Sequence, residues 1–122
     1  MNLSDGEWKL MNRLWQDGPN TIMRLTEALK PETGWSKHTV ITMLARLEAK
    51  GAVRHEEGER AKTYFSTVER EEASAAETEN FLSKVYNGQL GSMVNAMVDQ
   101  KALSKQEIDE LYEILKRAEE SK

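Results

Sequence analysis

The stretch SKHTVITMLARLEAKGAVRHEEGERAKTYFS, residues 36–66, decides the fold because its hydrophobic period changes halfway. Its first half repeats apolar residues at the three- and four-residue spacing of a helix that buries one face, namely Val40, Met43, Leu44 and Leu47. Gly51 can end that helix in the left-handed conformation. Residues 52–56 and 62–66 are rich in strand-forming side chains, and the turn residues 57–59 separate them. The stretch predicts a helix followed by a β-hairpin.

Two shorter helices are expected before this stretch. Residues 4–16 open with SDGE, a capping-box pattern, and Asp17-Gly18-Pro19 stops the helix. Its apolar face consists of Trp8, Met11 and Trp15. A second helix from residue 20 or 21 turns Ile22, Leu25 and Leu29 inward, and residues 30–34, KPETG, are expected to break it. Three short helices followed by a hairpin predict a mainly α chain whose residues 1–68 form a winged helix-turn-helix domain.

Composition excludes several classes of function. The 122 residues include no cysteine and two histidines, His38 and His55, so thiolate chemistry and a histidine-based zinc site have no support. No glycine-rich phosphate loop or nucleophile–base pair is recognisable, and the sequence predicts neither catalytic residues, nor a metal, nor a cofactor. No apolar run approaches the roughly 20 residues of a membrane helix, and the N-terminus lacks signal-peptide features. We expect a cytoplasmic protein without a membrane partner.

The net charge of −4 is unevenly distributed along the chain. Residues 1–68 carry a net charge of +1 and residues 69–122 carry −5. Phosphate contact depends on where the cations face rather than on the total charge. An acidic second half is therefore compatible with a first half that binds nucleic acid.

The polar flank of the helix in residues 36–50 carries side chains suited to double-stranded DNA. Lysine and arginine can bind guanine or phosphate, and threonine can use its hydroxyl or its methyl group against thymine. The N-terminal amides of the helix can hold a phosphate, and cations beyond the hairpin turn can meet the DNA backbone. The predicted DNA-binding residues are Ser36, Lys37, His38, Thr39, Thr42, Arg46, Arg60 and Lys62.

Each of these assignments has a simpler alternative. The flank can be a solvated helix face, and His38 can be an ordinary surface residue. His55 is expected to decorate the hairpin, and Trp35 to pack against the helix that follows it. The acidic residues of the hairpin would repel phosphate if they faced it; these are Glu56, Glu57 and Glu59.

Residues 69–122 predict three further helices with exposed apolar stripes. The apolar positions expected to mediate dimerisation are Phe81, Val85, Leu90, Val94, Met97, Leu103, Ile108, Leu111 and Leu115. Isolated helices of this length are only marginally stable in water, so the apolar stripes must pack against another part of the protein or a second chain. Folding back onto the first domain is one solution. Pairing with a second chain is favoured here, because a homodimer can bind two half-sites at once. A winged helix that binds proteins instead of DNA is the alternative function.

Four stretches of the sequence resemble the penicillinase-repressor family (BlaI/MecI/CopY). They are LSDGEWKLMNRLW at 3–15, GWSKHTVITMLARLEAKG at 34–51, GERAKTY at 58–64 and LSKQEIDEL at 103–111. The resemblance implies a homodimeric repressor of β-lactam-resistance or copper-handling genes, acting on palindromic operators with TACA and TGTA half-sites. It also implies DNA contacts from Ser36, Lys37, Thr39, Thr42, Arg46 and Arg60.

Two features depart from the family pattern. Copper-responsive members carry a C-terminal cysteine cluster, whereas this chain has no cysteine, so copper sensing of that kind is not expected. The β-lactam branch is inactivated by a regulatory protease that cleaves an Asn-Phe bond in the dimerisation segment. The corresponding bond here is Ala96–Met97, with Asn95 one residue early, which leaves a regulatory protease and other means of induction as alternatives.

Overall fold

The computed structural model describes residues 1–101 and 103–122, which divide into two compact units, Met1–Thr78 and Glu79–Lys122. Helix α4 begins in the first unit and ends in the second. The elements are α1 (Asp5–Asp17), β1 (Asn20–Thr21), α2 (Ile22–Thr33), α3 (Lys37–Ala49), β2 (Val53–Glu57), β3 (Lys62–Ser66), α4 (Arg70–Tyr86), α5 (Leu90–Gln100) and α6 (Lys105–Glu120).

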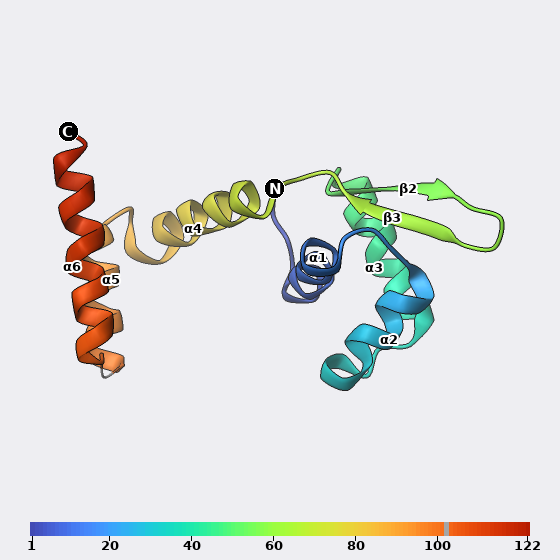
Figure 1. Cartoon of the computed structure of the whole chain (residues 1–122), viewed down its shortest axis with the longest axis horizontal. Helices are drawn as coiled ribbons and strands as arrows, with labels where there is room; N and C mark the ends of the chain where they lie inside the picture. Colours follow the sequence, from blue (N-terminus) through green and yellow to red (C-terminus); the bar gives the residue numbers. More distant parts are fainter. Residues whose placement is uncertain (102) are drawn as a thin grey trace. The chain divides into compact units, whose positions relative to one another are not determined.

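The first unit is a winged helix, as the sequence predicts (Figure 1). Strands β2 and β3 form an antiparallel hairpin in which Val53 pairs with Ser66 and Glu57 pairs with Lys62. Strand β1 pairs with the other edge of β3, so the sheet order is β1-β3-β2. We call residues 53–66 the wing.

Apolar side chains from all three helices meet in one core. The fully or nearly fully buried positions are Leu10, Met11, Leu14, Leu25, Leu29, Val40, Leu44 and Leu47. Val53 and Tyr64 of the hairpin close the core from the sheet side. Trp8 and Trp15 pack at its edge, and the indole Nε1 of Trp15 donates to Ser66 Oγ at 3.1 Å and to the Val68 carbonyl at 2.9 Å. The core thereby ties helix α1 to the base of the wing.

Two local predictions were wrong. Asn20 and Thr21 form strand β1 instead of the first turn of a helix, because their backbone pairs with Tyr64 and Thr63 of β3. Helix α2 also continues through Pro31 to Thr33. Proline removes one backbone donor, and the helix ends soon afterwards at Gly34, which adopts a left-handed conformation with φ of 66°.

The second unit contains the end of α4 and the helices α5 and α6. Ser104 and Glu107 form the predicted capping box of α6, with both hydrogen bonds at 3.1 Å. Along the described ranges of α4, α5 and α6 no side chain is buried. This unit therefore differs from the first, whose apolar stripes are covered within one chain.

The described residues were also searched for membrane-spanning helices. None of the helices found there combines the length and the apolar character needed to cross a bilayer.

An ion pair between the buried Glu7 and the exposed Lys50 joins the start of α1 to the end of α3. The Glu7 carboxylate is 2% exposed, and its Oε1 accepts from Lys50 Nζ at 2.6 Å and from the Ser4 amide at 2.7 Å. Its Oε2 has no hydrogen-bond partner among the described residues. Burial alone would raise the pKa of Glu7, but the hydrogen bonds from Lys50 and Ser4 outweigh it and hold the pKa below its ordinary value.

Replacing Lys50 by methionine tests this pair. At pH 7 we expect the free energy of unfolding to fall by about 2 kcal/mol, because Glu7 stays buried without its cation. Since the folded-state pKa of Glu7 is lowered, its contribution is present above the unfolded-state pKa and is lost as the pH falls through the folded-state value. In urea unfolding, the difference from the wild type should therefore narrow towards acid pH. An equal difference at neutral and acid pH would contradict this assignment.

Candidate nucleic-acid interface

Helix α3 presents a polar outer face because its apolar stripe faces the core. Val40, Leu44 and Leu47 are all 0% exposed. At 100° per residue, the opposite side carries His38, Thr42 and Arg46, and all three side chains are exposed. We call these three residues the outer face of α3. Ser36 and Lys37 at its start are exposed, and Thr39 is half-buried.

The start of α3 is capped by its own side chains. Ser36 is the N-cap residue, and its Oγ accepts from the Thr39 amide at 3.2 Å. The Thr42 hydroxyl donates to the His38 carbonyl at 3.1 Å, so its oxygen remains available as an acceptor. The remaining N-terminal amides of the helix are suited to an anion. Both hydroxyl groups are on exposed residues, and each forms a hydrogen bond with the helix backbone.

The wing places two further predicted cations beside α3. Arg60 lies in the hairpin turn, and Lys62 is the first residue of β3. The turn is closed by a hydrogen bond from the Gly58 amide to the Ala61 carbonyl at 3.0 Å. A Cβ at Gly58 would collide with that carbonyl, so this tight turn requires glycine. The turn fixes where Arg60 stands relative to the strands.

A groove of about 450 Å³ separates α3 from the wing, and we call it the wing groove. Lys37 and Ile41 line it from α3, and residues 57–62 line it from the wing. Its remaining lining comes from Ile22 and Met23 at the start of α2. The structure therefore brings three predicted DNA-binding residues into one depression, namely Lys37, Arg60 and Lys62.

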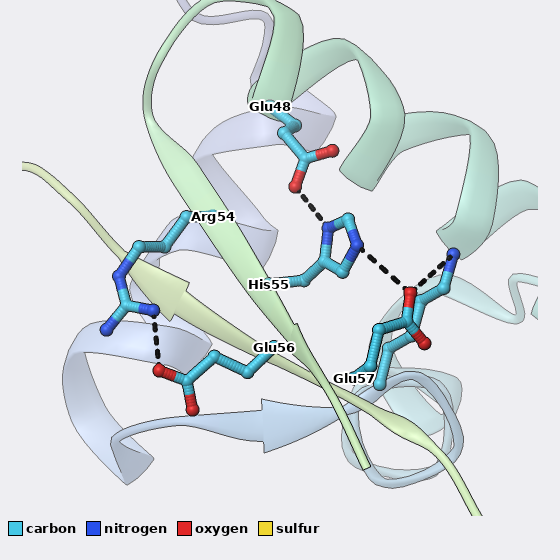
Figure 2. A network of polar contacts seen from close by, with 6 residues as sticks. Glu48, Arg54, His55, Glu56 and Glu57 are labelled. Atoms are coloured by element: carbon cyan, nitrogen blue, oxygen red, sulfur yellow. Dashed lines mark hydrogen bonds and ion pairs between the residues drawn. The ribbon is translucent and has the colours of Figure 1, made fainter.

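A polar network joins α3 to the wing, and Figure 2 shows His55 between Glu48 and Glu57. The His55 Nδ1 lies 2.5 Å from Glu48 Oε1 of α3, and its Nε2 lies 3.5 Å from Glu57 Oε1. Lys62 Nζ lies 4.0 Å from the same Glu57 oxygen. The His55 ring also stacks at a tilt beside Tyr64, with centroids 5.4 Å apart. His55 thus links the wing to α3 instead of merely decorating the hairpin.

The acidic residues of the wing do not all face the same way. Glu56 pairs with Arg54 at 2.9 Å, and Arg54 in turn lies over the Phe65 ring at 4.2 Å from its centroid. Glu57 and Glu59 line the wing groove, where Glu57 has His55 and Lys62 as partners. The ion pairs among the described residues do not include Lys37, Arg46 or Arg60. These three cations therefore carry uncompensated charge at the candidate interface.

The apolar positions assigned to dimerisation lie at or near the surface. The exposed ones are Phe81, Val85, Leu90, Val94, Met97, Ile108, Leu111 and Leu115, and Leu103 is half-buried. Within the second unit, residues of α5 and α6 border common apolar depressions, one of them lined by Val98, Leu103, Ile108, Leu111, Tyr112 and Leu115. The candidate cleavage position, Ala96–Met97, lies inside helix α5, where Ala96 is half-buried and Met97 is exposed.

Sequence reasoning missed two features of this surface. Ile41 is 39% exposed and Met23 is 60% exposed, although both are large apolar residues. Ile41 lies one helical turn after Lys37 and outside the buried stripe of α3. Its exposure could therefore have been predicted from its position in the sequence. The contact between His55 and Glu48 joins residues on different elements, and no local pattern predicts it. Among the described residues, no group of three or more possible metal ligands is found.

The fold and this surface define a winged-helix protein with a cationic helix–wing face. Comparison with known proteins refines the class. The family model described as penicillinase repressor matches residues 3–117, so the chain belongs to the penicillinase-repressor family. This is a family of repressors rather than enzymes.

Two similar proteins match nearly the whole chain, and a solved structure matches just over half of it. The methicillin resistance regulatory protein MecI of Mammaliicoccus sciuri is 31% identical over 94% of both chains. The penicillinase repressor of Bacillus licheniformis is 34% identical over 93% of this chain and 88% of its own. A solved structure of monomeric Bacillus licheniformis BlaI with the blaP half-operator matches with a TM-score of 0.51 and 28% identity, covering 57% of this chain and 85% of that one.

Replacing His55 by alanine tests the link between wing and helix. We expect the free energy of unfolding to fall by about 1 kcal/mol, because Glu48 and Glu57 lose their shared partner. Amide hydrogen exchange in β2 should also become faster. The matched control is Glu56→Ala on the same strand, whose exposed pair with Arg54 should contribute much less. Equal effects of the two substitutions would show that His55 has no linking role.

Proposed function

We propose that this chain is a transcriptional repressor that binds double-stranded operator DNA through α3 and the wing. The observation that carries the proposal is the convergence of Lys37, Arg60 and Lys62 around the wing groove, beside the exposed outer face of α3. A recognition helix of this kind enters the major groove while flanking cations hold the backbone. The names of the similar proteins, a penicillinase repressor and a methicillin resistance regulatory protein, support the proposal, as does the half-operator bound to the related BlaI.

The individual side chains have separate roles in this proposal. His38, Thr42 and Arg46 face the base edges, where arginine can bind guanine in bidentate fashion. Ser36, Thr39 and the first amides of α3 hold a phosphate near the helix start. Lys37, Arg60 and Lys62 contact the backbone that passes between helix and wing. A repressor acting in this way belongs in the cytoplasm with its operator.

We also propose that the repressor is a homodimer held together by residues 69–122. The apolar side chains of the second unit support this, because eleven large ones from α4, α5 and α6 are at least 37% exposed. Full burial of a completely exposed side chain of this kind gains about 1.5–3 kcal/mol, and these partly exposed side chains would gain a correspondingly smaller amount. Two linked winged helices can then occupy two half-sites about 34 Å apart, and polymerase is excluded from the promoter.

A regulatory protease is a further proposed partner. Cleavage at Ala96–Met97 would divide α5 and separate α6 from the DNA-binding unit. Seven of the eleven exposed large apolar side chains lie after this bond, so the dimer would lose most of its apolar surface and the two half-sites would no longer be bound together. The bond lies within a helix, so a protease requires local unwinding of α5 before it can cut.

The DNA-binding proposal is tested with a dyad-symmetric duplex carrying TACA and TGTA half-sites, compared with a scrambled duplex of equal length. We expect a clear preference for the symmetric duplex, and an affinity that falls steeply with salt. Arg60→Ala should make the slope of log affinity against log salt shallower by about one contact per half-site. The control Arg117→Ala removes a cation from α6 and should leave that slope unchanged. No preference for the symmetric duplex at low salt would overturn the proposal.

The dimer is tested with Leu111→Glu, which places a charge in the apolar stripe of α6. We expect the dimer dissociation constant to rise at least about a hundredfold, because an unpaired charge would be buried in the interface. Sedimentation equilibrium measures the change. The control Gln106→Glu adds the same charge to the opposite, polar side of α6 and should remain dimeric. If both variants sediment like the wild type, α6 does not mediate dimerisation.

A further inference from the structure

Two exposed apolar side chains stand out in the first unit. Among its described residues, the exposed large hydrophobic side chains are Met1, Met23 and Ile41. Two of the three, Met23 and Ile41, line the same wing groove. Most of the other large apolar residues described in this unit are buried in the core or pack against it. An apolar surface concentrated beside the candidate recognition helix therefore needs an explanation of its own.

Ile41 lies beside the residues assigned to the DNA bases and also faces the wing. Ile41 follows Lys37 by one helical turn and immediately precedes Thr42 of the outer face of α3. It therefore lies between the residues assigned to the base edges and those assigned to the backbone. Met23 approaches the same groove from the start of α2. A DNA duplex that contacts both Lys37 and Thr42 would therefore lie close to the Ile41 side chain.

The charges around the groove indicate what covers this apolar surface. Lys37, Arg60 and Lys62 border it, whereas Glu57 is drawn to His55 at 3.5 Å and to Lys62 at 4.0 Å. Glu59 is the other acid of the lining. A cationic border around an apolar floor fits a polyanion that carries small apolar groups. In the DNA major groove, that group is the C5-methyl of thymine.

We propose that Ile41, backed by Met23, is a specificity-determining residue that recognises thymine in each half-site through its C5-methyl group. This inference rests on the proposed DNA-binding function and adds a base preference to it. The isoleucine side chain excludes water from the methyl group without any hydrogen bond. Cytosine and uracil offer no methyl group at that position and are bound less tightly.

The experiment is a mutant cycle between the protein and the DNA. The probe is the duplex with TACA and TGTA half-sites, compared with duplexes in which individual half-site thymines are replaced by deoxyuridine. Uracil keeps every hydrogen-bonding group of thymine and lacks only the methyl. For the wild type we expect one such replacement to weaken binding about fourfold in one half-site and about fifteenfold in both. For Ile41→Ala we expect thymine and uracil duplexes to bind alike, whereas Ile41→Val should keep part of the difference.

The controls separate this inference from the proposed function. A wild type that does not prefer the symmetric duplex over a scrambled one contradicts the DNA-binding function itself. A wild type that prefers it but binds every uracil duplex equally well overturns only the role of Ile41. Thr42→Ser removes the neighbouring methyl and keeps the hydroxyl. If Thr42→Ser abolishes the uracil effect and Ile41→Ala does not, Thr42 reads the methyl group and the inference is wrong.

Discussion

The burial of Val40, Leu44 and Leu47 fixes the rotation of helix α3 about its own axis, and the candidate interface depends on that rotation. All three side chains are completely buried against α1, α2 and the base of the sheet. With this stripe in the core, the opposite side of α3 must face solvent. The flank that carries Lys37 and Ile41 must then face the wing. Packing in the core therefore determines which side chains are presented to a partner.

Most of the fold could be predicted because it depends on local sequence patterns. The helices and the hairpin follow from local hydrophobic periodicity, and the exposed flank of α3 follows from its buried stripe. Strand β1 could not be predicted in this way, because its two residues are ordered by pairing with Tyr64 and Thr63, more than forty positions later. The helix through Pro31 was missed because a proline near a helix end removes only one backbone hydrogen bond.

In the candidate site, too, some features could be predicted from local sequence and others depend on long-range contacts. Its cations were predictable because their types and spacing on one helix and one turn are visible in sequence. The contact of His55 with Glu48 depends on the register of β2 and on the length of α3 together, so it emerges only in three dimensions. It also changes the electrostatic interpretation of the wing. Glu57 lies beside the His55 ring and the Lys62 ammonium group, so an acidic wing sequence does not produce an acidic wing surface throughout.

The two units differ in how far their apolar side chains are covered within one chain. This difference bears on how the proposed DNA binding could be regulated. The first unit covers its own stripes and leaves Met23 and Ile41 exposed at the wing groove. The second leaves large side chains exposed along α5 and α6, including Met97, Leu111 and Leu115. If the second unit dimerises as proposed, DNA binding could be switched off by separating the two chains, without unfolding the winged helix. In the proposed homodimer, any event that weakens pairing of the second unit would lower operator occupancy through the loss of two-site binding, while each winged helix would keep its own DNA contacts.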